Sequence, residues 1–158
     1  TPAPTHDRAV VDDSYSMDGR NAQGRLLDQA RKGAQDAVMS YSATDRFQVL
    51  TGGFGGREQQ LLGRDEALEA IAQADVAPYS RSLSKVLLRQ REALAASEAK
   101  NKRALLFTDL QRAMVDLEHW TNDTLVSTVI VPLPPTTPDN LSIDSAWFAT
   151  PVRRAGQD

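Results

Sequence analysis

The sequence of 158 residues contains no cysteine and only two histidines. Both facts limit the metal sites and catalytic motifs that the chain can form. Without cysteine the chain forms no disulfide and no thiolate zinc site, which fits a protein outside the cytoplasm without establishing that location. His6 and His119 stand alone, and neither is paired with a nucleophile in a catalytic motif. The sequence therefore offers no argument for an enzyme.

Long apolar runs and an excess of positive charge are also missing. No run approaches the roughly 18 apolar residues that cross a membrane, and no signal peptide is present. A formal net charge of −3 argues against a dedicated nucleic-acid surface. The chain opens on Thr1-Pro2 without Met, so we expect it to come from a longer protein, and the missing targeting signals say little about that parent.

What the chain does contain is typical of one folded domain. Its apolar content of 41% and charged content of 25% are ordinary for a globular protein of this length. Residues 1–7 are polar and contain prolines, which predicts a linker, and residues 8–138 hold the expected domain. Prolines at 132, 134, 135 and 138 stop regular structure. Residues 139–158 then form a terminal tail with strand character.

Two apolar spacings alternate along the domain. Short apolar runs predict strands at 8–12, 46–51, 103–108 and 125–131, and a short edge strand at 59–62. Apolar residues three and four apart predict helices at 26–41, 65–74, 82–100 and 110–120. Strands that alternate with helices require right-handed crossovers. We therefore expect an α/β fold, a Rossmann-like three-layer sandwich whose central, mostly parallel sheet has helices on both faces.

The end of the first predicted strand carries the most informative motif. The apolar run Ala9-Val10-Val11 leads into Asp12-x-Ser14-x-Ser16. The carboxyl ends of parallel strands are where open α/β sheets bind ligands. A carboxylate and two hydroxyls are hard oxygen ligands, which suit Mg²⁺ or Ca²⁺. In the alternative interpretation, Asp and Ser merely cap the following helix.

This motif resembles the metal-ion-dependent adhesion site of von Willebrand factor type A (vWA) domains. That family places a second Asp after a later apolar strand, as Asp109 follows Arg103–Thr108 here. The resemblance implies a vWA-like fold and a metal shell of Asp12, Ser14, Ser16 and Asp109, filled by Mg²⁺ or another divalent cation. It also implies a non-enzymatic module that binds a protein partner through an acidic side chain.

One expected ligand is replaced in this sequence. The family has a Gly-Thr-x-Leu pattern at the helix that begins near residue 82, and alignment on Leu83 puts Arg81 at the Thr position. Ser80 or Ser82 reaches that position only with a shift of one residue. Arg81 would place a cation beside the metal and could pair with Asp12 or Asp109. We therefore expect weak divalent-cation binding at a partly degenerate site.

Two further segments resemble one bacterial subfamily, the membrane-anchored aerotolerance-type (BatA-like) proteins. Asp109-Leu110-Gln111-Arg112 matches their Asp-x-Gln-Arg pattern, and Asn140-Leu141-Ser142-Ile143 is similar to the start of their next domain. The resemblance implies two transmembrane helices before the domain and an extracytoplasmic location in the bacterial envelope. Residues 139–158 would begin a truncated β domain, since the helix that normally ends a vWA domain is missing here.

Two other functions stay open. The chain could be a structural or scaffolding domain that holds no metal. It could also be a receiver-like phosphoacceptor domain, because Val11-Asp12-Asp13-Ser14 is similar to the acidic pair that binds Mg²⁺ there. The receiver interpretation lacks its phosphoacceptor, since the predicted strand at 46–51 is followed by Gly52-Gly53, and Val131-Pro132 stands where a Lys-Pro pair is needed.

Overall fold

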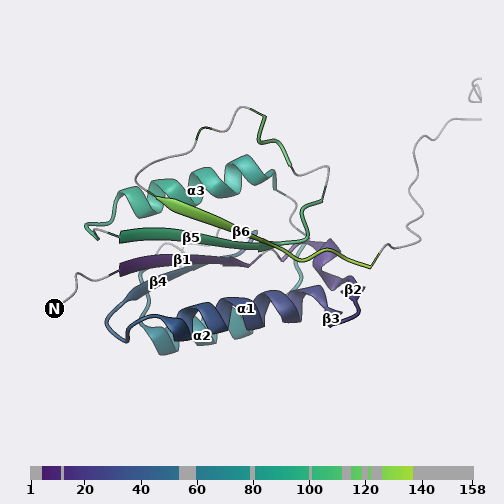
Figure 1. Cartoon of the computed structure of the whole chain (residues 1–158), viewed down its shortest axis with the longest axis horizontal. Coiled ribbons are helices and arrows are strands. Elements are labelled where there is room, and N and C mark those ends of the chain that lie inside the picture. The colour runs from purple at the N-terminus through teal and green to yellow at the C-terminus, as the bar shows by residue number, and fades with distance from the viewer. Residues whose placement is uncertain are drawn as a thin grey trace, which may run out of the picture.

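A parallel sheet forms the centre of the protein in the computed structural model, which describes residues 5–11, 13–53, 60–78, 81–99, 101–111, 115–118, 121 and 126–136. Within these residues four strands pair in the order β4-β1-β5-β6 (Figure 1). Their bounds are Thr5–Val11 for β1, Arg46–Leu50 for β4, Asn101–Thr108 for β5 and Ser127–Pro132 for β6. A small antiparallel hairpin joins β2 (Arg20–Asn21) to β3 (Gly24–Arg25).

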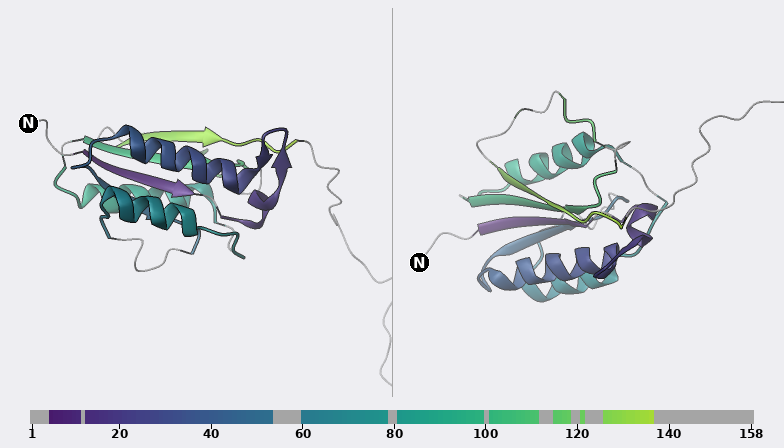
Figure 2. Two further views of the ribbon diagram at one scale, coloured as in Figure 1. Left: turned by 90° about the horizontal axis from the view of Figure 1, so that it is seen from below. Right: turned by 45° about the vertical axis from the view of Figure 1, so that its right-hand side comes forward.

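Helices cover both faces of this sheet. α1 (Leu26–Ser40) and α2 (Arg64–Gln73) lie side by side on one face, and α3 (Leu83–Ala95) lies on the other (Figures 1 and 2). A single 3-10 turn, η1 (Tyr15–Asp18), follows β1. The α/β class expected from alternating strands and helices is confirmed.

The larger core lies between the sheet and the pair α1 and α2. One face of α1 is buried at spacings of three and four residues and consists of Leu26, Leu27, Ala30, Ala34 and Val38. It packs against Phe47 and Phe107 of the sheet and against Ile71 of α2. Burial of each large apolar side chain contributes about 1.5–3 kcal/mol. The spacing of three and four residues that predicted this helix is therefore also the spacing of the residues that it buries.

The opposite face of the sheet packs against α3. Leu83 and Leu87 of α3 meet Leu50 of β4 and Leu106 of β5 in a second buried cluster. Gln90, one further turn along, is also buried, and its Nε2 donates to the backbone oxygen of Leu105 at 3.3 Å. This hydrogen bond ties a polar side chain of the helix directly to the central sheet.

The helix predicted at 110–120 is wrong for the residues of this segment that the structure describes. Residues 110, 111 and 115–118 are not helical, and Leu110 has a positive φ of 52°. Asp116 instead binds the start of α3, where its Oδ1 accepts from the Ser84 N–H at 2.8 Å. This carboxylate takes the place of an N-cap, because the side chain of Ser82, the N-cap residue, caps nothing. A tertiary contact therefore overrides the helical pattern of the segment.

Two boundaries also differ from the sequence prediction. β1 begins at Thr5, inside the predicted linker, because it is a central strand paired on one side with β4 and on the other with β5. The predicted edge strand at 59–62 is reduced, in its described residues, to one bridge between Leu62 and Phe47. The buried residues of α2 are Ala67 and Ile71, whereas Ala72 is exposed.

In the described residues, every helix is too short or too polar to cross a bilayer.

Candidate functional site

Three loops leave the sheet at the edge formed by the carboxyl ends of its strands. In the register of the sheet, Val10 pairs with Leu50 and Val11 with Phe107. The residues that follow these pairs therefore start from the same end of the molecule. Open α/β sheets bind ligands at this edge. Ser14, Ser16 and Asp109 all lie within a few residues of these strand ends, and their convergence on one cation stays a prediction.

Ser14 and Ser16 bring two hydroxyl oxygens together. Their Oγ atoms lie 3.0 Å apart, with Ser14 buried and Ser16 half-buried. Backbone bonds hold the turn, since Met17 N donates to Ser14 O and Gly19 N donates to Ser16 O, each at 2.9 Å. The fully buried side chain of Met17 fixes η1 to the core beneath α1. The two hydroxyls are therefore held side by side on an anchored turn.

Asp13 joins three loops at this edge, and sequence reasoning missed that role. Its side chain is buried, and its Oδ1 accepts from the Gly52 N–H at 2.7 Å. Its backbone oxygen accepts from the Ala77 N–H at 2.8 Å. The loop after β1 is thereby tied to the loop after β4 and to the segment after α2. The signal for this role in the sequence is the second carboxylate beside Asp12, which the sequence interpretation uses only in the receiver alternative.

Arg81 continues this set of contacts. Its Nε donates to the backbone oxygen of Gly52 at 2.5 Å, while Asp13 binds the amide of the same glycine. The guanidinium group is half-buried. The structure thus brings the positive charge of Arg81 to the loops at the carboxyl edge. Its pairing with Asp12 or Asp109 stays a prediction.

Asp109 follows the buried end of β5. Its Oδ1 is shielded from solvent, and the preceding Thr108 is buried. The Oγ1 of Thr108 accepts from the Leu110 N–H at 3.2 Å, at the position where the backbone takes its positive φ. A left-handed conformation is uncommon for a residue with a side chain. The chain therefore turns sharply as it leaves the candidate site.

The other predicted site residues are Asp12, Ser80 and Ser82. Asp12 and Ser80 lie outside the described residues. Ser82 stands at the N-cap of α3, and its Oγ lies 3.3 Å from the Oγ of Ser84. The Ser84 hydroxyl in turn donates to Asp116 Oδ2 at 2.5 Å. Ser82 therefore belongs to a polar cluster at the start of α3.

The donor types at this edge fit a hard divalent cation. Two adjacent hydroxyls and a shielded carboxylate are oxygen ligands of the kind that Mg²⁺ accepts while keeping water ligands. Within the part of the chain that the structure describes, no group of three His, Cys, Asp or Glu residues could hold a metal. A cation at this edge would therefore depend on Ser14 and Ser16 as well as on carboxylates.

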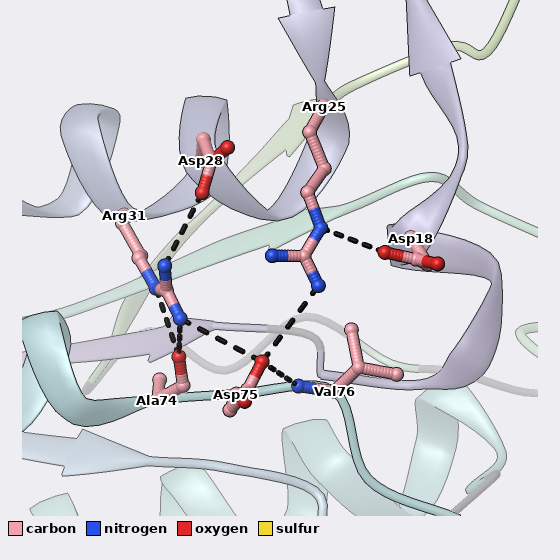
Figure 3. A network of polar contacts seen from close by, with 7 residues as sticks. All are labelled: Asp18, Arg25, Asp28, Arg31, Ala74, Asp75 and Val76. Atoms are coloured by element: carbon pink, nitrogen blue, oxygen red, sulfur yellow. Dashed lines mark hydrogen bonds and ion pairs between the residues drawn. The ribbon is translucent and has the colours of Figure 1, made fainter.

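A charged network supports the segment that leads to Ala77 (Figure 3). Arg31 of α1 donates through Nε to the backbone oxygen of Ala74 at 2.8 Å, and its Nη2 lies 3.9 Å from Asp75 Oδ1. Arg25 donates to Asp18 at 2.8 Å and lies 3.7 Å from Asp75. The carboxylates are largely exposed, so each ion pair contributes about 1 kcal/mol or less. Their shared effect is to hold the end of α2 against α1 and η1.

A cavity of about 390 Å³ lies elsewhere, beside the edge strand β4. Its polar lining residues include Glu66 and Glu69 of α2. Glu66 Oε2 accepts from the Gly63 N–H at 3.0 Å, and Glu69 Oε1 accepts from Gln73 at 3.1 Å. These carboxylates serve the helix itself, so the cavity offers no convergent set of ligands comparable to the carboxyl edge.

Comparisons with known proteins agree with the fold. No protein-family model matches the sequence, and no curated protein matches it. Among solved structures, the chain is similar to the vWF domain of the type V pili tip protein Mfa5 from Porphyromonas gingivalis. Sequence identity is 17% and the TM-score is 0.50, over 69% of this chain and 38% of that one.

This likeness supports the vWA-like fold that the Asp12-x-Ser14-x-Ser16 motif implied. The matched part is well under two thirds of the pilus protein's chain. Function resides in sites rather than in folds. At this level of identity the comparison therefore speaks for the arrangement of strands and helices, and the site must be judged from its own residues.

Proposed function

We propose that this chain is a vWA-like protein-binding module, a Rossmann-like three-layer sandwich without enzyme activity. The observation that carries the proposal is the pair of hydroxyls of Ser14 and Ser16, 3.0 Å apart at the carboxyl edge, on a fold similar to a vWF domain. Asp109 leaves the neighbouring strand at the same edge. Such a site recognises a side chain of a partner protein.

The residues that would hold a divalent cation are Asp12, Ser14, Ser16 and Asp109. A bound Mg²⁺ would supply an electrophile for a carboxylate of the partner. The partner would therefore present an acidic side chain. The turn η1, anchored by buried Met17, keeps the two hydroxyls aligned before any ligand arrives.

A second candidate function is a scaffolding domain that holds no metal. The contact of Arg81 with the backbone oxygen of Gly52 favours it, because this contact fixes a positive charge among the loops of the site. Repulsion between a guanidinium group and a divalent cation is costly in a half-buried position. The site is accordingly proposed as partly degenerate, with weak affinity for Mg²⁺.

The cellular setting is a proposal based on the sequence alone. The similarity of Asp109-Leu110-Gln111-Arg112 to the aerotolerance-type proteins supports a membrane-anchored parent in the bacterial envelope. The domain would then lie on the periplasmic side of the inner membrane. Reporter fusions at the start of the domain in the parent protein should be active outside the cytoplasm, and activity confined to the cytoplasm would refute this setting.

Calorimetric titration with Mg²⁺ tests the site. The unmodified chain should bind weakly, and Arg81→Thr should raise the affinity by about tenfold or more, about 1.4 kcal/mol, because it removes a positive charge and adds a hydroxyl ligand. Arg89→Thr removes the same charge from α3 and serves as the matched control. Replacement of both Ser14 and Ser16 by Ala should abolish the signal.

Two results would contradict this assignment. Tight Mg²⁺ binding by the unmodified chain, unchanged or weakened in Arg81→Thr, would make Ser80 or Ser82 the ligand and show that the register around Leu83 is wrong. Failure of Arg81→Thr to bind Mg²⁺ at all would favour the scaffolding domain.

A further inference from the structure

The two edges of the central sheet differ in how they are closed. At one edge, the outer side of β4 is capped by Leu62, which exchanges both backbone hydrogen bonds with Phe47, at 2.9 and 2.7 Å. At the other edge, β6 pairs with β5, and no other described residue pairs with it (Figure 1). An unpaired strand edge is a template for another strand.

Among the residues that the structure describes, β6 has little of the usual protection of an edge strand. Proteins discourage edge pairing with lysines, inward charges, bulges or coverage by a helix. The strand reads Ser127-Thr128-Val129-Ile130-Val131-Pro132, which contains no charged residue. Val129 is 43% exposed, and β6 lies at the rim of the sheet beyond α1 (Figure 2). Only Pro132, at its end, cannot donate to a ladder.

The faces of β6 limit how a second strand can join it. Val131 packs toward the core beneath α1, whereas Ile130 packs toward α3, so Val129 shares the α1 side with Val131. In a two-fold antiparallel pair that continues the sheet, residues of the same face must lie opposite each other. If residues 127–131 of the two copies pair in this way, the two-fold axis passes beside Val129.

In this register the strand is complementary to itself. Val129 meets Val129 of the second copy, Thr128 meets Ile130, and Ser127 meets Val131. Cross-strand pairs of β-branched residues are favourable, and no like charges are opposed. Val129, the most exposed large apolar side chain of β6, would be covered by its own symmetry mate.

We propose that β6 is a self-association edge, through which two copies of this chain join their sheets in an antiparallel, two-fold dimer. We assign the strand that pairs with β6 to a second copy of this chain, because β6 is uncharged, rich in β-branched residues and complementary to itself in this register. Antiparallel pairing directs the two carboxyl edges, with Ser14 and Asp109, to opposite ends of the dimer and leaves both accessible. The shared interface is small, so the dimer is weak. This inference does not depend on the proposed metal site.

Sedimentation equilibrium of the full chain tests the proposal. The mass should rise from one chain toward two over roughly 10 µM to 1 mM. Val129→Lys and Val129→Glu should each stay monomeric, because like charges meet at the two-fold axis. An equimolar mixture of the two variants should associate again, because Lys then faces Glu. Met39→Lys changes another exposed apolar residue, 56% exposed on α1, and should associate as the unmodified chain does.

Hydrogen exchange of the unmodified chain gives an independent measurement. Among residues 127–131, the N–H groups that point away from β5 should gain protection at the upper end of the concentration range, and those of α3 should not. A chain that remains monomeric throughout would overturn the proposal. The same holds if Val129→Lys associates normally, or if the mixed variants do not recover association.

Discussion

Gly33 shows how one missing side chain sets the distance between α1 and the sheet. A Cβ added at this position would lie 2.6 Å from Cε1 of Phe107, which is closer than real Cβ atoms approach other atoms. Phe107 is buried at the end of β5, so its ring has little room to move. Packing of this helix against β5 therefore depends on glycine, although glycine is a poor helix former.

Gly33→Ala should lower the free energy of unfolding by about 1–2 kcal/mol. Overpacking costs about 1–3 kcal/mol, and the better helix propensity of alanine returns up to about 1 kcal/mol. Urea denaturation measures the difference. In a Phe107→Leu background the clash is relieved, so the same substitution should be neutral or stabilising. An equal loss in both backgrounds would show that the ring of Phe107 is not the cause.

Among single residues, the candidate site shows which roles could be predicted from the sequence and which could not. Ser14, Ser16 and Asp109 could be predicted because each follows a recognisable apolar strand and carries a hard oxygen. Asp13 could not be assigned its role, because its partners Gly52 and Ala77 come from other elements and are chosen by the packing of three loops. A motif predicts candidate ligands, whereas buried hydrogen-bond partners depend on tertiary structure.

At the scale of elements, α3 begins with help from a distant part of the chain. Asp116 accepts from both the N–H and the hydroxyl of Ser84, and these hydrogen bonds lower the pKa of its carboxyl below the ordinary 3.8, the hydroxyl contributing most. A negative charge at a helix N-terminus is favourable because the unpaired N–H groups there carry partial positive charge. The segment that follows β5 is thereby held to α3.

Asp116→Asn should therefore make the protein less stable at neutral pH. A carboxylate with a lowered folded pKa adds stability that is fully present above its unfolded pKa, near 4, and is lost as the pH falls through the folded value. The difference between the two proteins should accordingly shrink below about pH 4. Urea denaturation across this range measures it, with Glu118→Gln as the matched control. A difference that does not change with pH would exclude the charged cap.

The periodicity of the sequence predicted the elements better than it predicted their ends. α1, α2, α3 and the four strands of the sheet were expected from the apolar runs and spacings of the sequence, and each of the three helices buries one apolar face. The segment at 110–120 has a helical pattern, yet its described residues are not helical, and Asp116 instead accepts a hydrogen bond from the start of α3. Local patterns cannot report such long-range competition.

At the scale of the whole molecule, the described chain after β6 stays bonded to the rest of the fold. Leu133 N donates to Thr108 O at 2.9 Å and so extends the sheet by one more bond. Asn21 Nδ2 donates to Pro134 O at 3.1 Å, which fastens the chain to the β2–β3 hairpin. Residues 133–136 therefore belong to the fold, and the domain boundary at residue 138 stays a prediction.

Two shortened chains test this boundary. A chain of residues 1–138 should melt at the same temperature as the full chain, because the predicted boundary assigns residues 139–158 to another unit. A chain of residues 1–132 should lose about 2–4 kcal/mol, since it lacks the bonds made by residues 133–136, each worth about 0.5–1.5 kcal/mol, together with the partial burial of Leu133. Thermal and urea denaturation of the three chains give the comparison. If the first truncation is as destabilising as the second, residues 139–158 are part of this domain, and the expectation that they begin a separate β domain is wrong.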